Sequence, residues 1–334
     1  MKKCILGVLI LFSACEEEIT LDINQESQTL VVEGGIEPGF PPYVILTRNQ
    51  GYFDPINVNT YEDLFIKEAE IKVWTNNLDG SSDSINLTLI SDSTPFFTDL
   101  DYFNSPNNYE FSKTDRKYYL EIKWNNHTIT SMTTIPEITP LDSLWVKQNP
   151  NTEADWWKES TCDIWSVYSD DASIQNNILI RSKRLEHWKR TSHGIVNIED
   201  PNLLLFDCGS DILINGESFE TVFLRPNPGS IPPLASYQSE RYEINNNQDS
   251  VFLPPDVVLI KFCQIDESSM RFWRSVVRQV TINGNPVSEP MNLVSNINGG
   301  LGIWTGYAPV YYKVPIVKDT VIFNQYIPGI DEIF

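Results

Sequence analysis

The sequence predicts a mainly β protein made of two strand-rich parts, with one short amphipathic helix in the second part. Short apolar or alternating segments separated by turn residues recur from residue 30 onward, a pattern typical of sandwiches and barrels. Only one segment repeats its apolar residues at helical spacing. Prolines within 134–140 interrupt the strand pattern and divide the chain into a β-sandwich over 30–136 and a larger β-rich domain over 137–334.

Ahead of these parts, the first residues have the pattern of a secretory signal. Two lysines precede an apolar run at 5–12, and two small residues precede Cys15. A charged start, a short apolar core and small residues at the end describe a cleaved signal peptide, and the run is shorter than the roughly 20 residues of a membrane-spanning helix. The cysteine favours a lipoprotein signal, with 1–14 removed and Cys15 acylated. The alternative is an ordinary signal with a chance cysteine.

Residues 15–29 are predicted to form an acidic tether. Glu16, Glu17 and Glu18 follow the cysteine directly. This triplet resembles the surface-export signal of Bacteroidota lipoproteins, and the resemblance implies a lipid-anchored outer-membrane protein that faces the cell exterior. The alternative is that the glutamates only keep the tether solvated. Stable anchoring takes more than one membrane signal, which the two or three acyl chains of a lipoprotein cysteine would supply.

The first half contains several segments that alternate apolar and polar residues. Alternation with a period of two predicts a strand with one buried face, and Asn125-Asn126 is a turn between two such segments. Short strands with turns between them suggest an immunoglobulin-like sandwich. Strands are expected at 30–33, 43–47, 69–74, 85–89, 119–124 and 127–134.

The second half reads as strands with longer loops and one helix. Asp266 is a suitable N-cap. Apolar residues then recur at three- and four-residue steps, and Arg271, Arg274 and Arg278 fall together on one face. Strands are expected at 144–146, 162–168, 177–181, 203–206, 257–262 and 303–307.

Composition excludes some functions. The chain carries 45 acidic against 24 basic residues, a formal charge of −21, and such a surface repels phosphate backbones, so nucleic-acid binding is not expected. Asp99 and Asp101 could offer oxygens to calcium, but the segment lacks the glycine and glutamate of a recognised loop, and a solvated loop is the simpler interpretation. No cofactor and no metal are predicted.

The cysteines suggest a structural role. Cys162, Cys208 and Cys263 lie downstream of the signal with no metal-like spacing between them. In an oxidising compartment, one disulfide and one buried thiol are expected. The preferred pair is Cys162 with Cys208, although spacing cannot select among the three pairings.

The usual catalytic motifs are absent from the sequence. It contains no G-x-S-x-G elbow, no H-E-x-x-H and no P-loop lysine. Of the three histidines, His127 sits at a hairpin, and His187 and His193 have no useful ligand spacing. An enzyme is therefore not predicted, and no catalytic residue is proposed.

Two groups of residues are candidates for partner or ligand contact. Basic side chains gather around one tryptophan in an acidic chain and could bind lipopolysaccharide phosphates or an acidic partner surface; the alternative is a solvated strand edge. Aromatic pairs in loop-like surroundings could stack on sugars or anchor an interface; the alternative is core packing. The basic group is Arg181, Lys183, Arg184, Trp188, Lys189 and Arg190, and the main aromatic pair is Trp156-Trp157.

The C-terminal region carries a family resemblance. The run Ser295-Asn296-Ile297-Asn298-Gly299-Gly300-Leu301-Gly302, the opening Val31-Val32-Glu33-Gly34 and the segment Thr133-Thr134-Ile135-Pro136 resemble an uncharacterised family of Bacteroidota outer-membrane lipoproteins, usually encoded beside TonB-dependent receptors. The resemblance implies an all-β lipoprotein that cooperates with a receptor in nutrient uptake. The glycines themselves predict a tight turn or bulge that leads into a strand.

The favoured hypothesis is therefore a binding accessory of a TonB-dependent transporter, held at the membrane by its N-terminal lipid. A structural or adhesion lipoprotein of the cell envelope is an alternative, and a carboxylate-based hydrolase is a further one.

Overall fold

The protein is described by a computed structural model that contains strands over most of its length. The described residues are 29–49, 60–91, 93–101, 109–148, 162–186, 188–191, 194–197, 204–213, 215–223, 242–244, 250–252, 257–282, 293–317, 320–322, 324–329 and 332. The fold is mainly β, which confirms the predicted class.

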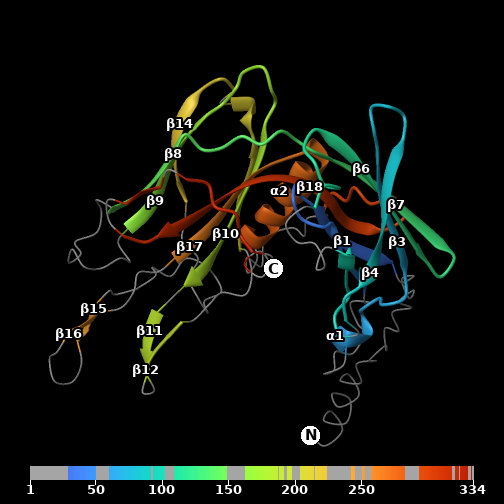
Figure 1. The fold of residues 1–334 in the computed structure, drawn as a ribbon, viewed down its shortest axis with the longest axis horizontal. Helices are drawn as coiled ribbons and strands as arrows, with labels where there is room; N and C mark the ends of the chain where they lie inside the picture. The colour runs from blue at the N-terminus through green and yellow to red at the C-terminus, as the bar shows by residue number, and fades with distance from the viewer. Residues whose placement is uncertain are drawn as a thin grey trace, which may run out of the picture.

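Eleven strands form one long sheet, in the order β13-β10-β17-β18-β1-β2-β5-β4-β3-β6-β7. In Figure 1, β10 and β17 lie on one side of β18, and β3, β6 and β7 lie on the other. A four-stranded sheet has the order β14-β9-β8-β19, and two hairpins, β11-β12 and β15-β16, lie apart from both sheets. The strands of the long sheet are β1 (Leu30–Ile36), β2 (Tyr43–Arg48), β3 (Glu70–Asn76), β4 (Ser82–Leu89), β5 (Phe96–Thr98), β6 (Arg116–Trp124), β7 (His127–Ile135), β10 (Asn177–Glu186), β13 (Leu204–Ser210), β17 (Val257–Ile265) and β18 (Leu301–Pro315). The remaining elements are α1 (Thr60–Asp63), β8 (Ser143–Gln148), β9 (Cys162–Ser169), β11 (Trp188–Thr191), β12 (Gly194–Asn197), the 3-10 turn Asp211–Leu213, β14 (Ser218–Phe223), β15 (Tyr242–Ile244), β16 (Ser250–Phe252), α2 (Glu267–Ile282) and β19 (Val321–Ile322).

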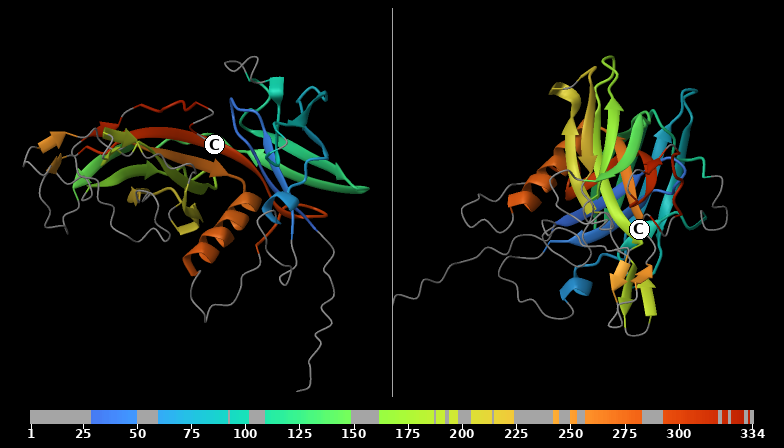
Figure 2. Two further views of the ribbon diagram at one scale, coloured as in Figure 1. Left: turned by 90° about the horizontal axis from the view of Figure 1, so that it is seen from below. Right: turned by 90° about the vertical axis from the view of Figure 1, so that its left-hand side faces the viewer.

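Strand β18 belongs to both halves of the molecule. Its first residues pair in parallel with β1, where Trp304 is opposite Gly34. Its later residues pair antiparallel with β17, where Val310 is opposite Phe262. Figure 2 shows β18 as one long strand that runs between the two halves. The N-terminal sheet is thus completed by residues that follow β1 by more than two-thirds of the chain.

The N-terminal half encloses a core between the two ends of its curled sheet. Strand β7 returns to the beginning of β18, where the backbone N–H groups and carbonyls of Thr130 and Asn298 exchange hydrogen bonds of 3.1 and 2.8 Å. Trp304 is fully buried in this core and donates from Nε1 to the Tyr118 carbonyl at 3.2 Å. Alternation on β3, β6 and β7 supplies seven of the other buried side chains of this core, and β1 and β2 supply five more.

The C-terminal half is a sandwich of two sheets. The four-stranded sheet packs its inner residues, such as Leu144 and Ile164, against Val258, Ile260 and Val310 of the long sheet. All nine residues of β17 are buried, because this strand has the four-stranded sheet on one face and α2 or the C-terminal segment on the other. A continuous apolar run is the expected sequence of a strand covered on both faces.

Helix α2 confirms the predicted helix and its cap. Asp266 accepts hydrogen bonds from the Ser269 N–H and the Ser268 hydroxyl, each at 2.8 Å. Met270 and Trp273 are buried against β13, β10 and β18, as the periodicity predicted, whereas Val280 is largely exposed near the helix end.

The predicted boundary near 134–140 falls between β7 and β8, and β18 then joins the parts on its two sides. The predicted strands correspond to observed ones, and β18 is much longer than the predicted 303–307. The turn before it has positive φ at Gly299, and Gly302 at the start of β18 has positive φ as well, as the sequence predicted.

Candidate functional site

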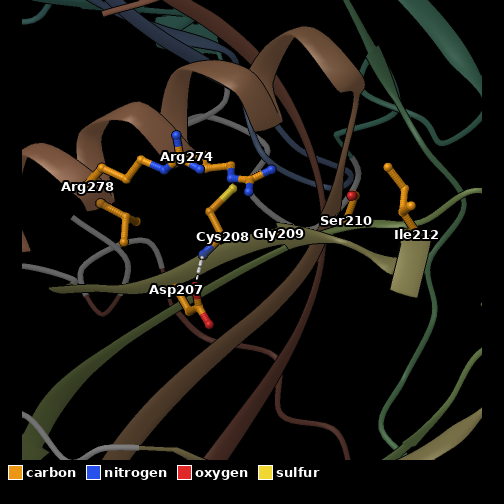
Figure 3. Close-up of a pocket in the computed structure, with 8 residues that line it drawn as sticks. Asp207, Cys208, Gly209, Ser210, Ile212, Arg274 and Arg278 are labelled. Carbon is orange, nitrogen blue, oxygen red and sulfur yellow. Dashed lines mark hydrogen bonds between the residues drawn. The ribbon is translucent and has the colours of Figure 1, made fainter. Parts of the chain in front are cut away.

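The most distinctive hollow in the described residues is a cleft between strand β13 and helix α2. Its volume is ≈450 Å³. One wall is strand β13, and the other is the side of helix α2 that carries Arg274 and Arg278 (Figure 3). Its lining residues are Asp207, Cys208, Gly209, Ser210, Ile212, Arg274, Val277 and Arg278.

The helix wall is held in place by its buried face. Trp273 donates from Nε1 to the Thr305 hydroxyl of β18 at 3.3 Å, and the Arg181 guanidinium lies 5.5 Å from the Trp273 ring centroid. The Asp266 carboxylate also accepts from the Thr133 hydroxyl at 2.6 Å and from the Thr134 N–H at 2.9 Å. The N-terminus of α2 is therefore fixed to β7, and its exposed arginines have a defined position over β13.

The strand wall is the end of the long sheet. Strand β13 pairs with β10 on one side, and no other described strand pairs with its second side. An edge strand presents backbone N–H and C=O groups to whatever lies beside it. Asp207 is exposed, and its carboxylate accepts from the adjacent Cys208 N–H at 2.7 Å.

Two arginines give the cleft its charge. Arg274 and Arg278 are both exposed, and neither forms an ion pair with a carboxylate of the described residues. The neighbouring Arg271, which does not line the cleft, pairs with Glu267 on the same helix. In Figure 3 the Arg274 side chain extends over Cys208 from the helix above. The cleft can thus receive acidic groups.

The thiol in the cleft is not suited to nucleophilic chemistry. Burial, with further contributions from Cys263 and Asp207, raises the pKa of Cys208 to about 12, against a weaker lowering effect of Arg274. The thiol donates a weak hydrogen bond to the Met270 carbonyl, with sulfur and oxygen 3.6 Å apart. Since the thiolate is the reactive form, Cys208 is inert at neutral pH.

The predicted disulfide between Cys162 and Cys208 is not formed. Cys208 and Cys263 are both free and buried. Cys162 opens β9 in the four-stranded sheet, whereas Cys208 lies on β13 of the long sheet and packs beneath α2. The two cysteines therefore belong to different layers, a separation that spacing along the chain could not reveal.

The predicted basic contact group is not a single surface. Lys183 and Arg184 are buried within β10, and Arg181 packs against Trp273, so these three residues contribute to the interior rather than to an exposed patch. One face of β10 packs against the four-stranded sheet and the other against α2. The side chains of Trp188, Lys189 and Arg190, in the hairpin β11-β12, lie outside the description.

Other predicted residues also fall outside the described part. These are the signal at 1–14, Cys15, Glu16, Glu17, Glu18, and the pair Trp156-Trp157. Of the remaining candidates, His127 is exposed at the start of β7. The Asp99 carboxylate accepts from the Asp101 N–H and from the Tyr109 hydroxyl, each at 3.0 Å. Among the described residues no cluster of His, Cys, Asp or Glu could hold a metal ion.

A second hollow lies at the β6-β7 hairpin. It has a volume of ≈510 Å³ and opens widely to solvent. It is lined by Glu68, Ala69, Glu70, Lys123, Trp124, Asn125, Asn126, His127 and Thr128. Its lining holds charges of both signs, Glu68 and Glu70 against Lys123, and Lys123 also pairs with Glu121 outside the hollow at 3.0 Å.

Sequence reasoning missed a buried ionic group where the two halves meet. Glu37, just after β1, forms an ion pair with Lys261 of β17 and accepts from the Tyr311 hydroxyl of β18 at 2.7 Å. Lys261 also lies 4.3 Å from the Tyr307 ring centroid. The only signal in the sequence was a lysine inside an otherwise apolar strand, because a charge there needs a buried partner.

The family run Ser295–Gly302 has a clear structural role. The Asn296 side chain accepts from the Trp304 N–H at 2.9 Å and donates to the Trp304 carbonyl at 2.8 Å. It thereby satisfies backbone groups on the side of β18 that faces β7. Farther along, the Gly306 N–H donates to the Thr133 hydroxyl at 2.7 Å.

No described helix has both the length and the apolar character needed to cross a membrane.

Comparison with protein families gives a match to the model described as "Domain of unknown function (DUF4249)" over residues 16–312. No curated protein matches the chain.

Proposed function

Since the chain belongs to the DUF4249 family, whose function is unknown, we propose from its own features that it is a binding accessory of a transporter. In this proposal it is a surface-anchored outer-membrane lipoprotein of a Bacteroidota-type cell envelope. It assists a TonB-dependent receptor in nutrient uptake and makes contacts rather than catalysing a reaction.

One observation carries the proposal. A signal-like segment ends at Cys15, the acidic triplet follows, and the family match begins at Glu16, directly after that cysteine. A leader followed by a lipidated first residue accounts for this junction. The C-terminal run Ser295–Gly302 and its resemblance to receptor-linked lipoproteins add support.

The anchor is tested by locating variants in the cell. Cys15→Ser should move the protein from the outer-membrane fraction to the soluble fraction, because acylation needs the thiol. Cys4→Ser is the matched control, since this residue lies within the leader, and it should leave the protein in the membrane. If the Cys15→Ser variant stays in the outer membrane, the anchor is elsewhere and the proposal fails.

The orientation is tested by protease treatment of intact cells. Wild-type protein should be digested, and a variant with Glu16, Glu17 and Glu18 changed to glutamine should be membrane-bound but protected. Equal digestion of the two proteins would show that the triplet only solvates the tether.

The partner is tested by crosslinking in intact outer membranes. Recovery of a TonB-dependent β-barrel with the lipoprotein is the expected result. Recovery of the lipoprotein alone, or of cell-wall polymer, would favour a structural or adhesion role instead.

A further inference from the structure

We infer that the cleft between β13 and α2 binds an acidic, extended polypeptide segment of a partner protein, which adds to β13 as a strand. The inference rests on the proposed function only for the existence of a partner. The cleft would recognise two properties of this segment. Its backbone N–H and C=O groups are available for hydrogen bonds, and it carries carboxylates at alternate positions.

The first argument is the edge of the sheet. β13 ends the eleven-stranded sheet in the described residues, and its residues Asp207 to Ser210 line the cleft. Peptides that add to an exposed sheet edge gain affinity from main-chain hydrogen bonds. The cleft therefore offers the geometry that an extended segment uses.

The second argument is the spacing of the arginines. Arg274 and Arg278 are four residues apart, which places them on neighbouring turns about 6 Å apart along the helix. Alternate residues of a strand point to the same face and are separated by about 6.6–6.8 Å. An added strand with acidic residues two apart can therefore present one carboxylate to each guanidinium, and arginine is well suited to bind carboxylates with two parallel hydrogen bonds.

The third argument is the balance of charges inside the cleft. The whole chain has a formal charge of −21, so an acidic partner is repelled at long distance. Physiological salt screens exposed charges beyond about 8 Å, and inside the cleft two arginines face one carboxylate, Asp207. The cleft is thus a site on a strongly acidic protein where acidic side chains are favoured.

The remaining lining makes a segment of protein a better occupant than a phosphate group. Ile212 is 70% exposed beside the cleft, and Val277 is half-buried within it. A phosphate would use only the arginines, whereas an extended peptide can cover these apolar side chains and also bond to the strand edge.

The experiment uses a nine-residue peptide in which glutamate alternates with threonine or valine, labelled for fluorescence anisotropy. Wild-type protein should bind it, and a peptide with lysine in place of glutamate should bind at least tenfold more weakly. The double variant Arg274→Glu/Arg278→Glu should lose at least tenfold in affinity. Arg271→Glu is the matched control, because it makes the same charge change on the same helix outside the cleft, and it should bind as the wild type does.

Strand addition is tested separately from charge. Two further peptides carry N-methyl groups, one on the odd-numbered amides and the other on the even-numbered amides. Only the peptide whose methyl groups block the N–H groups that bond to β13 should lose affinity. Hydrogen exchange at Asp207–Ser210 should slow when the parent peptide is bound.

Several results would overturn the inference. These are no binding of the acidic peptide, equal binding by the double variant, and full binding by both methylated peptides. Arginine-dependent binding of inorganic phosphate or anionic vesicles without peptide binding would assign the cleft to phosphate instead. None of these results depends on where the protein is located in the cell, so failure here is distinct from failure of the proposed anchor.

Discussion

Asp266 shows how one carboxylate can order three elements. One of its oxygens caps α2, and the other accepts from the Thr133 hydroxyl and the Thr134 N–H of β7. The Thr133 hydroxyl in turn accepts from the Gly306 N–H of β18. The sequence predicted the cap, but it held no sign of the second set of bonds, because those partners are more than 130 residues away.

Replacing Asp266 tests this arrangement. Asp266→Ala should lower the free energy of unfolding by about 2–4 kcal/mol, since it removes a helix cap and leaves charge-assisted hydrogen bonds unmade. Denaturant unfolding measures the change. Glu267→Ala, at the exposed neighbour, is the control and should cost no more than about 0.5 kcal/mol. Similar losses in both variants would mean that neither the cap nor the bonds to β7 contribute more to stability than an exposed helix residue does.

The two buried thiols predict sensitivity to alkali. Burial raises the pKa of Cys208 and of Cys263 to about 12, from an ordinary value near 9. Both groups stay protonated in the folded state above pH 9 but ionise in the unfolded state, so the stability they contribute is full below pH 9 and is lost as the pH rises toward 12.

The double variant Cys208→Ala/Cys263→Ala should therefore lose stability less steeply with pH. Between pH 9.5 and 11 the free energy of unfolding should fall less steeply with pH in this variant than in the wild type. The difference in slope should be about 2.7 kcal/mol per pH unit, which is the contribution of two thiols. Unfolding at several pH values measures the slope, and a comparison at pH 7 isolates the cost of the cavities. Parallel curves for the two proteins would show that the thiols titrate normally.

Among the strands, β18 depends most on its glycines. Gly302 has a φ of 106°, and a Cβ atom there would lie 1.9 Å from the Val32 carbonyl oxygen. Backbone cannot yield as a flexible side chain does, so only glycine permits the parallel pairing of β1 with β18. This is the physical reason for the last glycine of the family run.

Gly302→Ala should therefore destabilise the protein by more than about 3 kcal/mol, or prevent folding, because backbone strain is added to a steric clash. Gly209→Ala is the matched control, since a Cβ there meets nothing within 4 Å and its φ is unexceptional. It should stay within about 1 kcal/mol of the wild type. Circular dichroism and denaturant unfolding compare the two. If Gly302→Ala is as stable as Gly209→Ala, the pairing does not require this glycine.

Local pattern predicted the elements better than their assembly. Alternation found β3, β6 and β7, and helical periodicity found α2, because each pattern reflects a single buried face. The length of β18 was not predicted, since its Tyr307–Pro315 portion is buried on both faces and has no alternation. The three-residue strand β5 was too short to show a pattern.

The candidate site was less predictable than the fold. The arginines on one face of α2 were recognised, but their apposition to β13 depends on a contact across more than 60 residues. The basic residues of β10 misled the prediction. Neighbouring positive side chains usually indicate a surface exposed to solvent, but Lys183 and Arg184 are buried between layers. Whether a strand is an edge is likewise decided only by the assembled sheet.

Across the whole protein, the ion pair of Glu37 with Lys261 joins the two halves. Both side chains are almost completely buried, 8% and 4% exposed, and the Tyr311 hydroxyl gives Glu37 a further donor. Removal of one partner leaves the other as an uncompensated buried charge, whereas removal of both avoids that cost.

Lys261→Met should therefore lower the free energy of unfolding by about 3–5 kcal/mol. The double variant Glu37→Gln/Lys261→Met should be more stable than Lys261→Met alone, and a double-mutant cycle of unfolding measures this coupling. Additive losses would mean that the two charges are solvated independently.

A strand that serves both halves also dictates when the protein can fold. β1 begins at Leu30, yet its parallel neighbour starts at Leu301, so the N-terminal core stays open until the residues from Leu301 onward have been synthesised. Pairings this remote along the chain form slowly. The unfinished chain must therefore be shielded from aggregation and proteolysis until β18 is available for pairing.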